Sequence, residues 1–387
     1  MKRGLLVSLV VVGLLVIGFF SFGPHLFDRA ANRVLSKGPF RVSERAERLF
    51  EELFVVDLHA DPLLWDRDLG KRLDHGAVDI PRLIEGNVAI QSFFLVTKSP
   101  WTQNNDRTPA ESDAITTLIT VQGWPRRTRG SLLERALFQA ARLHQLAEES
   151  QARLVVIETK TDLRRYREAR IEGRVEVAGI LGVEGAHVLE GDLANLRRLF
   201  DAGVRIVAPT HFFDNAIGGS MHGVEKGGLS ELGRAMIREM ETRGMLLDLA
   251  HASSAVIEDA LALSTRPVIV SHTGVRGTCD NNRNLSDAQI QAIAATGGVI
   301  GIGYWDTAVC GDDATAIARA IVYTAEQVGA EHVALGSDFD CAVPVPFDTT
   351  GLALIVDALI ERGMGESDIR RVMGENAARV FAEVLPD

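Results

Sequence analysis

A (β/α)8 barrel of the TIM type, preceded by a transmembrane helix, is the fold predicted for these 387 residues. From Phe54 onward, short runs rich in Val, Ile and Leu alternate with longer segments whose apolar residues recur at three- and four-residue spacing. This alternation is typical of βα units around a parallel sheet. In addition, residues that commonly bind metals stand where the apolar runs stop, and a barrel presents its strand ends to one common site.

Eight apolar runs qualify as strands, which is the number that this barrel requires. A doubly wound open sheet is the alternative, but it requires a Gly-rich nucleotide loop that the sequence lacks. The polar stretch 98–130 is expected to be a long loop after the second strand, where it would shape a substrate pocket. The expected strands are Phe54–Leu58, Val88–Val96, Val177–Val183, Arg205–Pro209, Met245–Leu249, Pro267–Ser271, Gly298–Gly303 and His332–Gly336, and the expected helices include Leu132–Ser150, Asp192–Ala202, Leu229–Arg243, Ser286–Ala295 and Ala314–Val328.

The first residues have a different composition from the rest. Lys2 and Arg3 precede an uncharged run from Gly4 to Gly23, which Pro24 ends. About 20 helical residues span the hydrocarbon core of a bilayer, so the run predicts an uncleaved membrane anchor, with a cleaved signal peptide as the alternative. The basic start places the N-terminus in the cytoplasm and the remaining chain outside it. The expected organisation is an anchor or signal over 1–24, a linker with a first short helix over 25–44, and a barrel domain over 45–387.

Charge and cysteine content exclude several classes of protein. The net charge of −11 and the lack of a basic stripe with interleaved aromatics disfavour nucleic-acid binding. The three cysteines Cys279, Cys310 and Cys341 have no CxxC spacing, which argues against a disulfide framework and against a cysteine-based zinc site. One disulfide with one free thiol stays possible.

Five residues at the ends of four runs form a candidate metal-binding set. His59 and Asp61 in VVDLHAD are two residues apart, so in an extended backbone both side chains point to one face. Glu184 in GVEGAH has two oxygens that can bridge two cations. His251 in LLDLAH and His272 in PVIVSH end consecutive runs, which core packing alone explains poorly. Imidazoles and carboxylates together suit zinc and similar divalent ions.

Other polar residues near the expected strand ends have several interpretations. Asp338 in GSDFD could accept a proton from a metal-bound water. His211 in APTH is a candidate ligand, substrate contact or polar strand end. His187 and His222 lie in loops near the expected site. The chain has no G-x-S-x-G elbow, so a covalent serine mechanism is not indicated.

Taken together, these motifs resemble the membrane (renal) dipeptidase family of zinc peptidases, which are related to the amidohydrolases. The resemblance extends from about Glu44 to the C-terminus and follows the order of the family's motifs. It implies a (β/α)8 barrel with a binuclear zinc centre, and homodimers among its members. The motifs are DLHAD, DIPRLIEGNVAIQSF, GVEGAH, GGLSELG, LLDLAHAS, PVIVSH, RNLSD, GSDFD and GENAARVF.

The resemblance also implies roles for individual residues. His59 and Asp61 look like ligands of the first zinc, and His251 and His272 look like ligands of the second. Glu184 looks like the bridge between the two ions. The remaining roles are a proton acceptor and donor at Asp338, contact with the scissile carbonyl at His211, and pairing with the substrate carboxylate at Arg283.

Two segments depart from the family pattern in places that bear on substrate. The stretch FFDNAIGGSMHG after His211 differs from that of the vertebrate enzymes. The run ending in GYWD offers Tyr304 or Trp305 where the family often has a substrate-contacting tyrosine, and Trp305 is included in the expected substrate site.

The expected function is that of a binuclear zinc dipeptidase, in which a metal-bridging hydroxide attacks a small dipeptide-like substrate. Two divalent cations bring a charge of +4 and the two ligand carboxylates return −2, which lowers the pKa of a bridging water. Manganese or cobalt could replace zinc. The alternatives are a binuclear hydrolase of another small amide, lactam or ester, a catalytically silent binding protein and, less favoured, a phosphate-ester hydrolase. The expected location is a bacterial inner membrane, with the catalytic domain on the periplasmic side.

Overall fold

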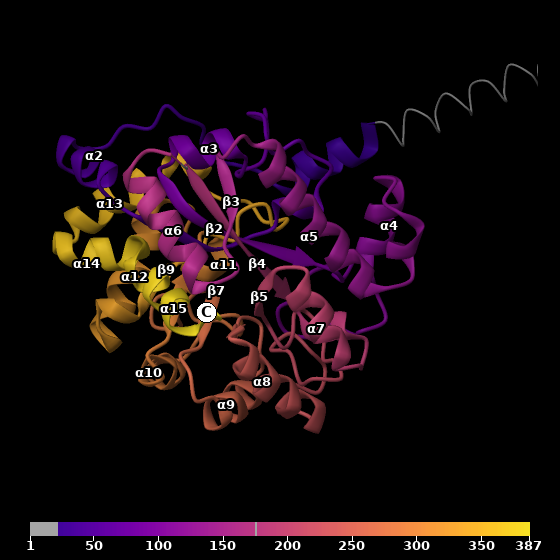
Figure 1. Ribbon diagram of the computed structural model, residues 1–387. Helices are drawn as coiled ribbons and strands as arrows, with labels where there is room; N and C mark the ends of the chain where they lie inside the picture. Colours follow the sequence, from indigo (N-terminus) through magenta and orange to yellow (C-terminus); the bar gives the residue numbers. More distant parts are fainter. Residues whose placement is uncertain (1–21, 175) are drawn as a thin grey trace, which may run out of the picture.

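The structure is a computed structural model that describes residues 22–174 and 176–387 (Figure 1). The predicted membrane anchor over 1–24 therefore lies almost wholly outside the described residues. Within the described ranges, no helix is both long enough and apolar enough to cross a bilayer.

Eight parallel strands form the core sheet in the order β6-β5-β4-β2-β1-β9-β8-β7. The two ends of this order approach each other, because Asp248, directly after β6, forms a parallel bridge with Ile269 at the start of β7, and Leu249 N donates to Ile269 O at 2.8 Å. The sheet therefore curls into a TIM-like barrel, as predicted. The strands are β1 (Val55–Ala60), β2 (Val88–Val96), β4 (Val177–Glu184), β5 (Val204–Val207), β6 (Leu246–Leu247), β7 (Ile269–Thr273), β8 (Val299–Ile302) and β9 (Val333–Leu335).

Helices surround the strands on the outside of the barrel (Figure 1). Their starts are fixed locally by side chains that accept hydrogen bonds from free backbone N–H groups. Asp313 caps α12 by accepting from Ala316 N at 2.8 Å, and Ser286 forms a capping box with Gln289 at the start of α10. The helices are α2 (Glu44–Glu51), α3 (Ile80–Glu85), α4 (Ala114–Val121), α5 (Leu132–Glu149), α6 (Lys160–Ile171), α7 (Ala194–Asp201), α8 (Glu231–Arg243), α9 (Ser254–Leu263), α10 (Asp287–Ala295), α11 (Asp306–Val309), α12 (Ala314–Val328), α13 (Ala353–Glu361), α14 (Glu366–Arg370) and α15 (Asn376–Val384), and shorter helical turns include η1 (Pro62–Leu64).

Three details of the predicted elements were wrong. A further strand, β3 (Leu154–Val156), pairs only with β4 and lies off the barrel order; it is too short to show a repeating pattern. The stretch 98–130 is not all loop, because it contains α4, whose Ile115 and Ile119 are buried. The run Met245–Leu249 contributes only the two residues of β6, since a single bridge continues the pairing beyond Leu247.

The three cysteines form one disulfide and one free thiol, which is the arrangement that the sequence left possible. Cys279 and Cys310 are bonded, and Cys341 is free. The bond joins the segment after β7, which carries Arg283, to the end of α11, which follows Trp305. It therefore restrains two residues that were expected to contact substrate.

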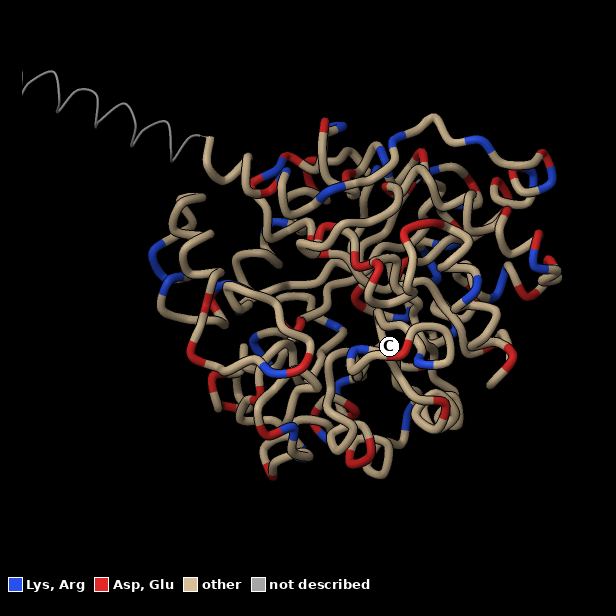
Figure 2. The backbone as a smooth tube through the Cα atoms, turned by 180° about the vertical axis from the view of Figure 1, so that it is seen from behind, with Lys and Arg blue, Asp and Glu red and all other residues tan. Residues whose placement is uncertain are grey.

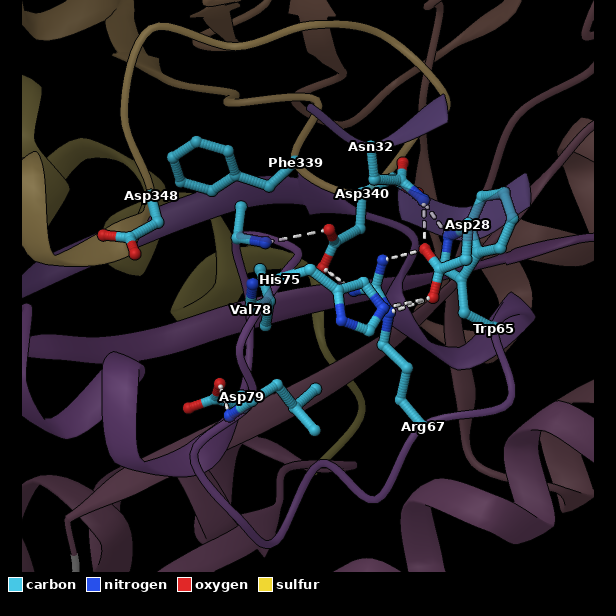
Figure 3. Close-up of polar contacts among 12 residues, drawn as sticks. Asp28, Asn32, Trp65, Arg67, His75, Val78, Asp79, Phe339, Asp340 and Asp348 are labelled. Atoms are coloured by element: carbon cyan, nitrogen blue, oxygen red, sulfur yellow. Dashed lines mark hydrogen bonds and ion pairs between the residues drawn. The ribbon is translucent and has the colours of Figure 1, made fainter. Parts of the chain in front are cut away.

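The predicted linker over 25–44 begins within a helix, residues 22–31, that is fixed to the barrel. Figure 3 shows the buried ion cluster that holds it. Asp28 on this helix pairs with Arg67, whose Nε donates to Asp28 Oδ2 at 2.7 Å, and Arg67 Nη1 lies 2.7 Å from Asp340 Oδ2. All three side chains are at most 3% exposed. Burial alone would raise the pKa of Asp28, but hydrogen bonds from Arg67 and His75 outweigh burial and hold this pKa well below its usual value.

The same cluster reaches the segment after β9. Asp340 accepts hydrogen bonds from Ala77 N at 2.9 Å and Val78 N at 3.1 Å, and its carbonyl accepts from Trp65 Nε1 at 2.7 Å. Asn32, just after the helix, accepts from Ala342 N at 2.9 Å. The carboxylate of Asp340 is therefore shared by Arg67 and two backbone N–H groups.

Charges of both signs are interspersed along the backbone in this view from behind (Figure 2).

Replacing Arg67 with methionine should destabilise the protein by about 3–5 kcal/mol, because Asp28 and Asp340 would remain buried without their cation. Urea denaturation measures this change. The matched control is Arg29→Met on the same helix, which removes an exposed ion pair with Asp74 and should cost no more than about 1 kcal/mol. Equal effects of the two substitutions would contradict the importance of the buried cluster.

Candidate metal centre

The predicted metal-binding residues converge at the C-terminal ends of the barrel strands. His59 lies in β1, with Asp61 directly after it, and Glu184 is the last residue of β4. His272 lies in β7, and His251 follows β6 by four residues. Each of the five is at most 5% exposed. The barrel thus brings together residues that are more than 200 positions apart in sequence, because the ends of parallel strands meet on one face.

Glu184 is the centre of this arrangement. Its Oε1 lies 3.1 Å from His251 Nε2, 3.4 Å from His272 Nε2 and 3.7 Å from His59 Nε2. Its Oε2 lies 3.2 Å from His211 Nε2. One buried carboxylate therefore faces four imidazole nitrogens, with its two oxygens directed to different histidines.

A serine and an aspartate determine which nitrogen of His272 and His59 carries the proton. Ser271 donates to Asp248 Oδ2 at 2.6 Å, so its oxygen is free to accept. Ser271 Oγ lies 2.9 Å from His272 Nδ1 and 3.3 Å from His59 Nδ1. Both Nδ1 atoms must then donate, which leaves both Nε2 atoms unprotonated and directed toward Glu184.

His251 is oriented in the same way by another histidine. His222 Nδ1 lies 3.1 Å from the carbonyl oxygen of Asn105 and must donate to it. His222 Nε2 therefore accepts from His251 Nδ1, 2.9 Å away, and the Nε2 of His251 is left unprotonated. His222 was not included in the predicted site, and its position in a loop gave no signal of this contact.

These groups fit a divalent cation. Among the described residues, the buried atoms His59 Nε2 and Asp61 Oδ1 have no hydrogen-bond partner. The unprotonated Nε2 atoms of His251 and His272 lie 2.9 Å apart, which is unfavourable for two lone pairs unless a cation lies between them. Neutral imidazoles with carboxylate oxygens are the ligand set that zinc and related ions prefer.

The pKa values of the site residues also favour a bound cation. Burial, followed by the charge of Arg283, holds the pKa of His59 and of His251 well below the usual value, so these imidazoles are neutral. Burial and the neighbouring charges of Asp61 and Asp338 raise the pKa of Glu184. A bound cation removes this penalty, since it compensates the buried carboxylates directly.

Asp338, three residues after β9, borders the ligand cluster. Its Oδ1 lies 3.8 Å from His59 Nε2. Burial is the main cause that raises the pKa of Asp338 to about 6, and hydrogen bonding to the Cys341 thiol and the charge of Arg283 oppose it. A carboxyl group that titrates near neutral pH is suited to accepting and returning a proton.

His251 and Asp338 both have an unfavourable backbone conformation, with φ of 61° for each. This left-handed region is uncommon for residues other than glycine, and it is found at functional sites where the surrounding structure holds it in place. The sharp turns that these residues make at the ends of their strands allow both side chains to face the cavity.

Two further residues lie close to the ligands. Asp57 accepts from Ser337 N at 2.8 Å, from Ser337 Oγ at 2.6 Å and from Gln91 Nε2 at 2.9 Å, and so fixes the end of β9. Cys341 Sγ lies within 4.8 Å of ligand atoms of His59 and Asp61.

The predicted substrate contacts lie beside the ligands. Arg283 is 3% exposed, its Nη2 donates to His272 O at 2.9 Å, and its guanidinium lies 5.3 Å from the centre of the Trp305 ring. Trp305 lines the cavity over the site, as do Arg283 and His211. Tyr304, the other candidate in GYWD, is fully buried and packs edge-on against Phe339, so of the two it is Trp305 that faces the cavity.

The cavity has a volume of about 550 Å³. Its floor carries the charged residues Asp61, Glu184 and Asp338, and its outer part is apolar. A volume of this size is typical of sites that hold small organic ligands.

The fold and the site together define a TIM-like barrel protein with a buried centre for divalent cations at the ends of its strands. The chain belongs to the membrane dipeptidase family, peptidase family M19, whose family model matches residues 43–385. The family resemblance inferred from the motifs is thereby confirmed.

Individual relatives agree with this assignment. Dipeptidase verJ of Clonostachys rogersoniana is 31% identical over 250 residues, which are 62% of this chain and 63% of that relative, so the match spans less than two thirds of its length. A metallo peptidase from Rhodobacter sphaeroides, solved with a phosphinate mimic of the dipeptide L-Ala-D-Ala, is 24% identical with a TM-score of 0.70, over 86% of this chain and 99% of that one. The probable dipeptidase PvdM from Pseudomonas aeruginosa is 21% identical with a TM-score of 0.73, over 88% and 98%. These two structures show a shared fold.

Replacing Ser271 with alanine should weaken metal binding by about 10- to 100-fold, because the Nδ1 protons of His272 and His59 would lose their common acceptor. Competition with a chromophoric chelator measures the affinity. Ser92→Ala is the matched control, since Ser92 is equally buried on β2 and its hydroxyl has no partner among the described residues. An unchanged affinity in Ser271→Ala would contradict the proton assignment.

Proposed function

We propose that this protein is a binuclear zinc dipeptidase. The observation that carries the proposal is the convergence of four imidazole nitrogens on one buried carboxylate, Glu184, in a chain of the membrane dipeptidase family. His59 and Asp61 would hold one ion, His251 and His272 the other, and Glu184 would contact both. When bound, two such cations lower the pKa of water enough to supply hydroxide at neutral pH and polarise the carbonyl that it attacks.

The remaining residues would bind the substrate and move a proton. Arg283 has guanidinium N–H groups at the cavity wall and pairs with the free carboxylate of a dipeptide. His211 donates a hydrogen bond to the carbonyl oxygen, on which negative charge develops in the transition state. Asp338 holds the proton taken from the nucleophile and returns it to the leaving amine. The apolar walls around these groups limit the access of bulk water.

Asp338→Asn should lower kcat for dipeptides by about 100-fold or more while the protein keeps its metal, because the amide cannot accept the proton. Turnover of L-Ala-L-Ala and L-Ala-D-Ala and the metal content per chain are measured on the same samples. Asp306→Asn, an exposed substitution next to Trp305, is the control and should leave kcat unchanged. A zinc-loaded wild-type protein that hydrolyses neither dipeptide would overturn the proposed activity.

Arg283 distinguishes a dipeptidase from a hydrolase of another amide, lactam or ester. Arg283→Met should raise KM strongly for dipeptides and much less for their C-terminal amides, since those substrates have no carboxylate to pair with it. Preference of the wild type for substrates without a carboxylate would favour the alternative function.

We also propose that the uncharged run 4–23 anchors the protein in a membrane with the barrel outside the cytoplasm. The Cys279–Cys310 disulfide suits an oxidising compartment, which supports this location. The full chain should be recovered in the membrane fraction, and a chain starting at residue 22 should be recovered in the supernatant. Recovery of both in the supernatant would contradict the anchor. Light scattering on the same preparations would show whether the protein forms the homodimer that the family resemblance implies.

A further inference from the structure

The cavity over the metal centre has two chemically different parts. The inner part presents the charged residues of the site, including Glu184 and Arg283. The outer part takes its apolar side chains mostly from three segments, the helix 22–31, the turn after β1, and α4, and it also includes the polar residues Ser99, Gln103, Asn105 and Thr117. A simple dipeptide such as alanyl-alanine would fill only the inner part. The apolar lining of the outer part includes Phe27, Ala31, Leu64, Trp65, Leu118 and Val121.

The helix 22–31 forms part of this apolar lining, which is the apolar wall of the cavity. Phe27 and Ala31 line the cavity, and the ring of Phe27 lies 6.1 Å from that of Trp65. Ala31 packs with Trp65 and with Ile115 of α4 in one apolar cluster, and Figure 1 shows this indigo helix beside α4. Its other face carries Asp28, which the buried Arg67 fixes to the barrel (Figure 3).

Two large apolar side chains at the mouth of the cavity are exposed to solvent. Phe27 is 55% exposed and Trp101, also on the cavity rim, is 65% exposed. Large apolar side chains that remain open to solvent at the mouth of a site are typical of binding surfaces. The helix also lies before residue 43, where the match to the family model begins.

The order of the strands indicates which end of a substrate the wall would contact. Arg283 follows β7, whereas the apolar wall follows β1 and β2, and β9 and β8 lie between them in the sheet. A carboxylate bound to Arg283 therefore places the leaving amino acid on the β7 side of Glu184. The acyl side of the scissile amide then points toward Trp65, Phe27 and α4.

We propose that helix 22–31 and α4 form an apolar subsite for a hydrocarbon group of several carbons on the acyl side of the scissile amide. The preferred substrates are then amphiphilic, with a free carboxylate at Arg283 and an apolar chain at Phe27 and Leu118. This inference rests on the proposed function and extends it to a substrate class. The uncharged run 4–23 ends at Gly23, which itself lines the cavity, so an anchored protein would place this subsite close to the bilayer surface.

The chain can be attached in two ways, as the side chain of the first residue or as an N-acyl group. Two substrate series separate these cases: alanyl-, norvalyl- and norleucyl-alanine, and N-acetyl-, N-hexanoyl- and N-decanoyl-alanine. For at least one series, kcat/KM of the full-length protein should rise by about fourfold for each added methylene until the subsite is full. A rise in a single series identifies the attachment. Values that stay flat or fall in both series overturn the proposal.

Matched variants assign the effect to this wall. Phe27→Ser and Leu118→Ser should each reduce the ratio of kcat/KM for the longest to the shortest substrate by about tenfold. Leu26→Ser is the control, because Leu26 is 66% exposed on the same helix and does not line the cavity. An unchanged ratio in both cavity variants, or an equal loss in Leu26→Ser, would overturn the subsite.

Binding to the zinc-loaded Asp338→Asn protein separates this proposal from the proposed activity. Calorimetric titration with the shortest and the longest member of each series should show tighter binding of the longer compound in at least one series, even if no dipeptide is hydrolysed by the wild type. Tighter binding of the longer compound without turnover would refute the dipeptidase and retain the subsite. Turnover of dipeptides with no dependence of binding on chain length in either series would do the reverse.

Discussion

The buried carboxylate of Glu184 is the constraint on which the site depends. Burying an ionised carboxylate is costly unless positive charge lies close to it, and the imidazoles around it are neutral. The hydrogen bonds of Ser271 and His222 keep those imidazoles in the form that offers lone pairs and not protons. The site therefore requires positive charge, which a divalent cation would supply.

Much of the fold and of the ligand set could be predicted from the sequence, because both depend on local patterns. The run Val88–Val96 and the amphipathic segment Ala314–Val328 were predicted with the bounds that the structure has. His59, Asp61, Glu184, His251 and His272 were predicted because each ends an apolar run, and the barrel brings such ends together. The short strand β3 and helix α4 were missed, since a few residues in a polar setting carry no period of their own.

Residues that act through another side chain could not be predicted in this way. His222 contacts His251 across 29 positions, and Ser271 contacts His59 across 212, so neither pair produces a local signal. The segment 25–44 was expected to be a linker with a first short helix. Asp28 is instead buried against Arg67 and Asp340, and only the tertiary structure brings these three residues together.

The helix 22–31 places the feature that would select the size of the substrate on a different part of the fold from the candidate metal centre. The candidate metal ligands and Asp338 lie in the barrel strands or in the turns directly after them, where a substitution disturbs a shared core. Part of the apolar wall of the cavity lies on a peripheral helix, which apolar packing and the ion cluster of Asp28 attach to the barrel. The exposed face of that helix is remote from the barrel core. With the proposed subsite, the preferred size of the substrate can therefore diverge among close relatives while the candidate metal centre stays the same.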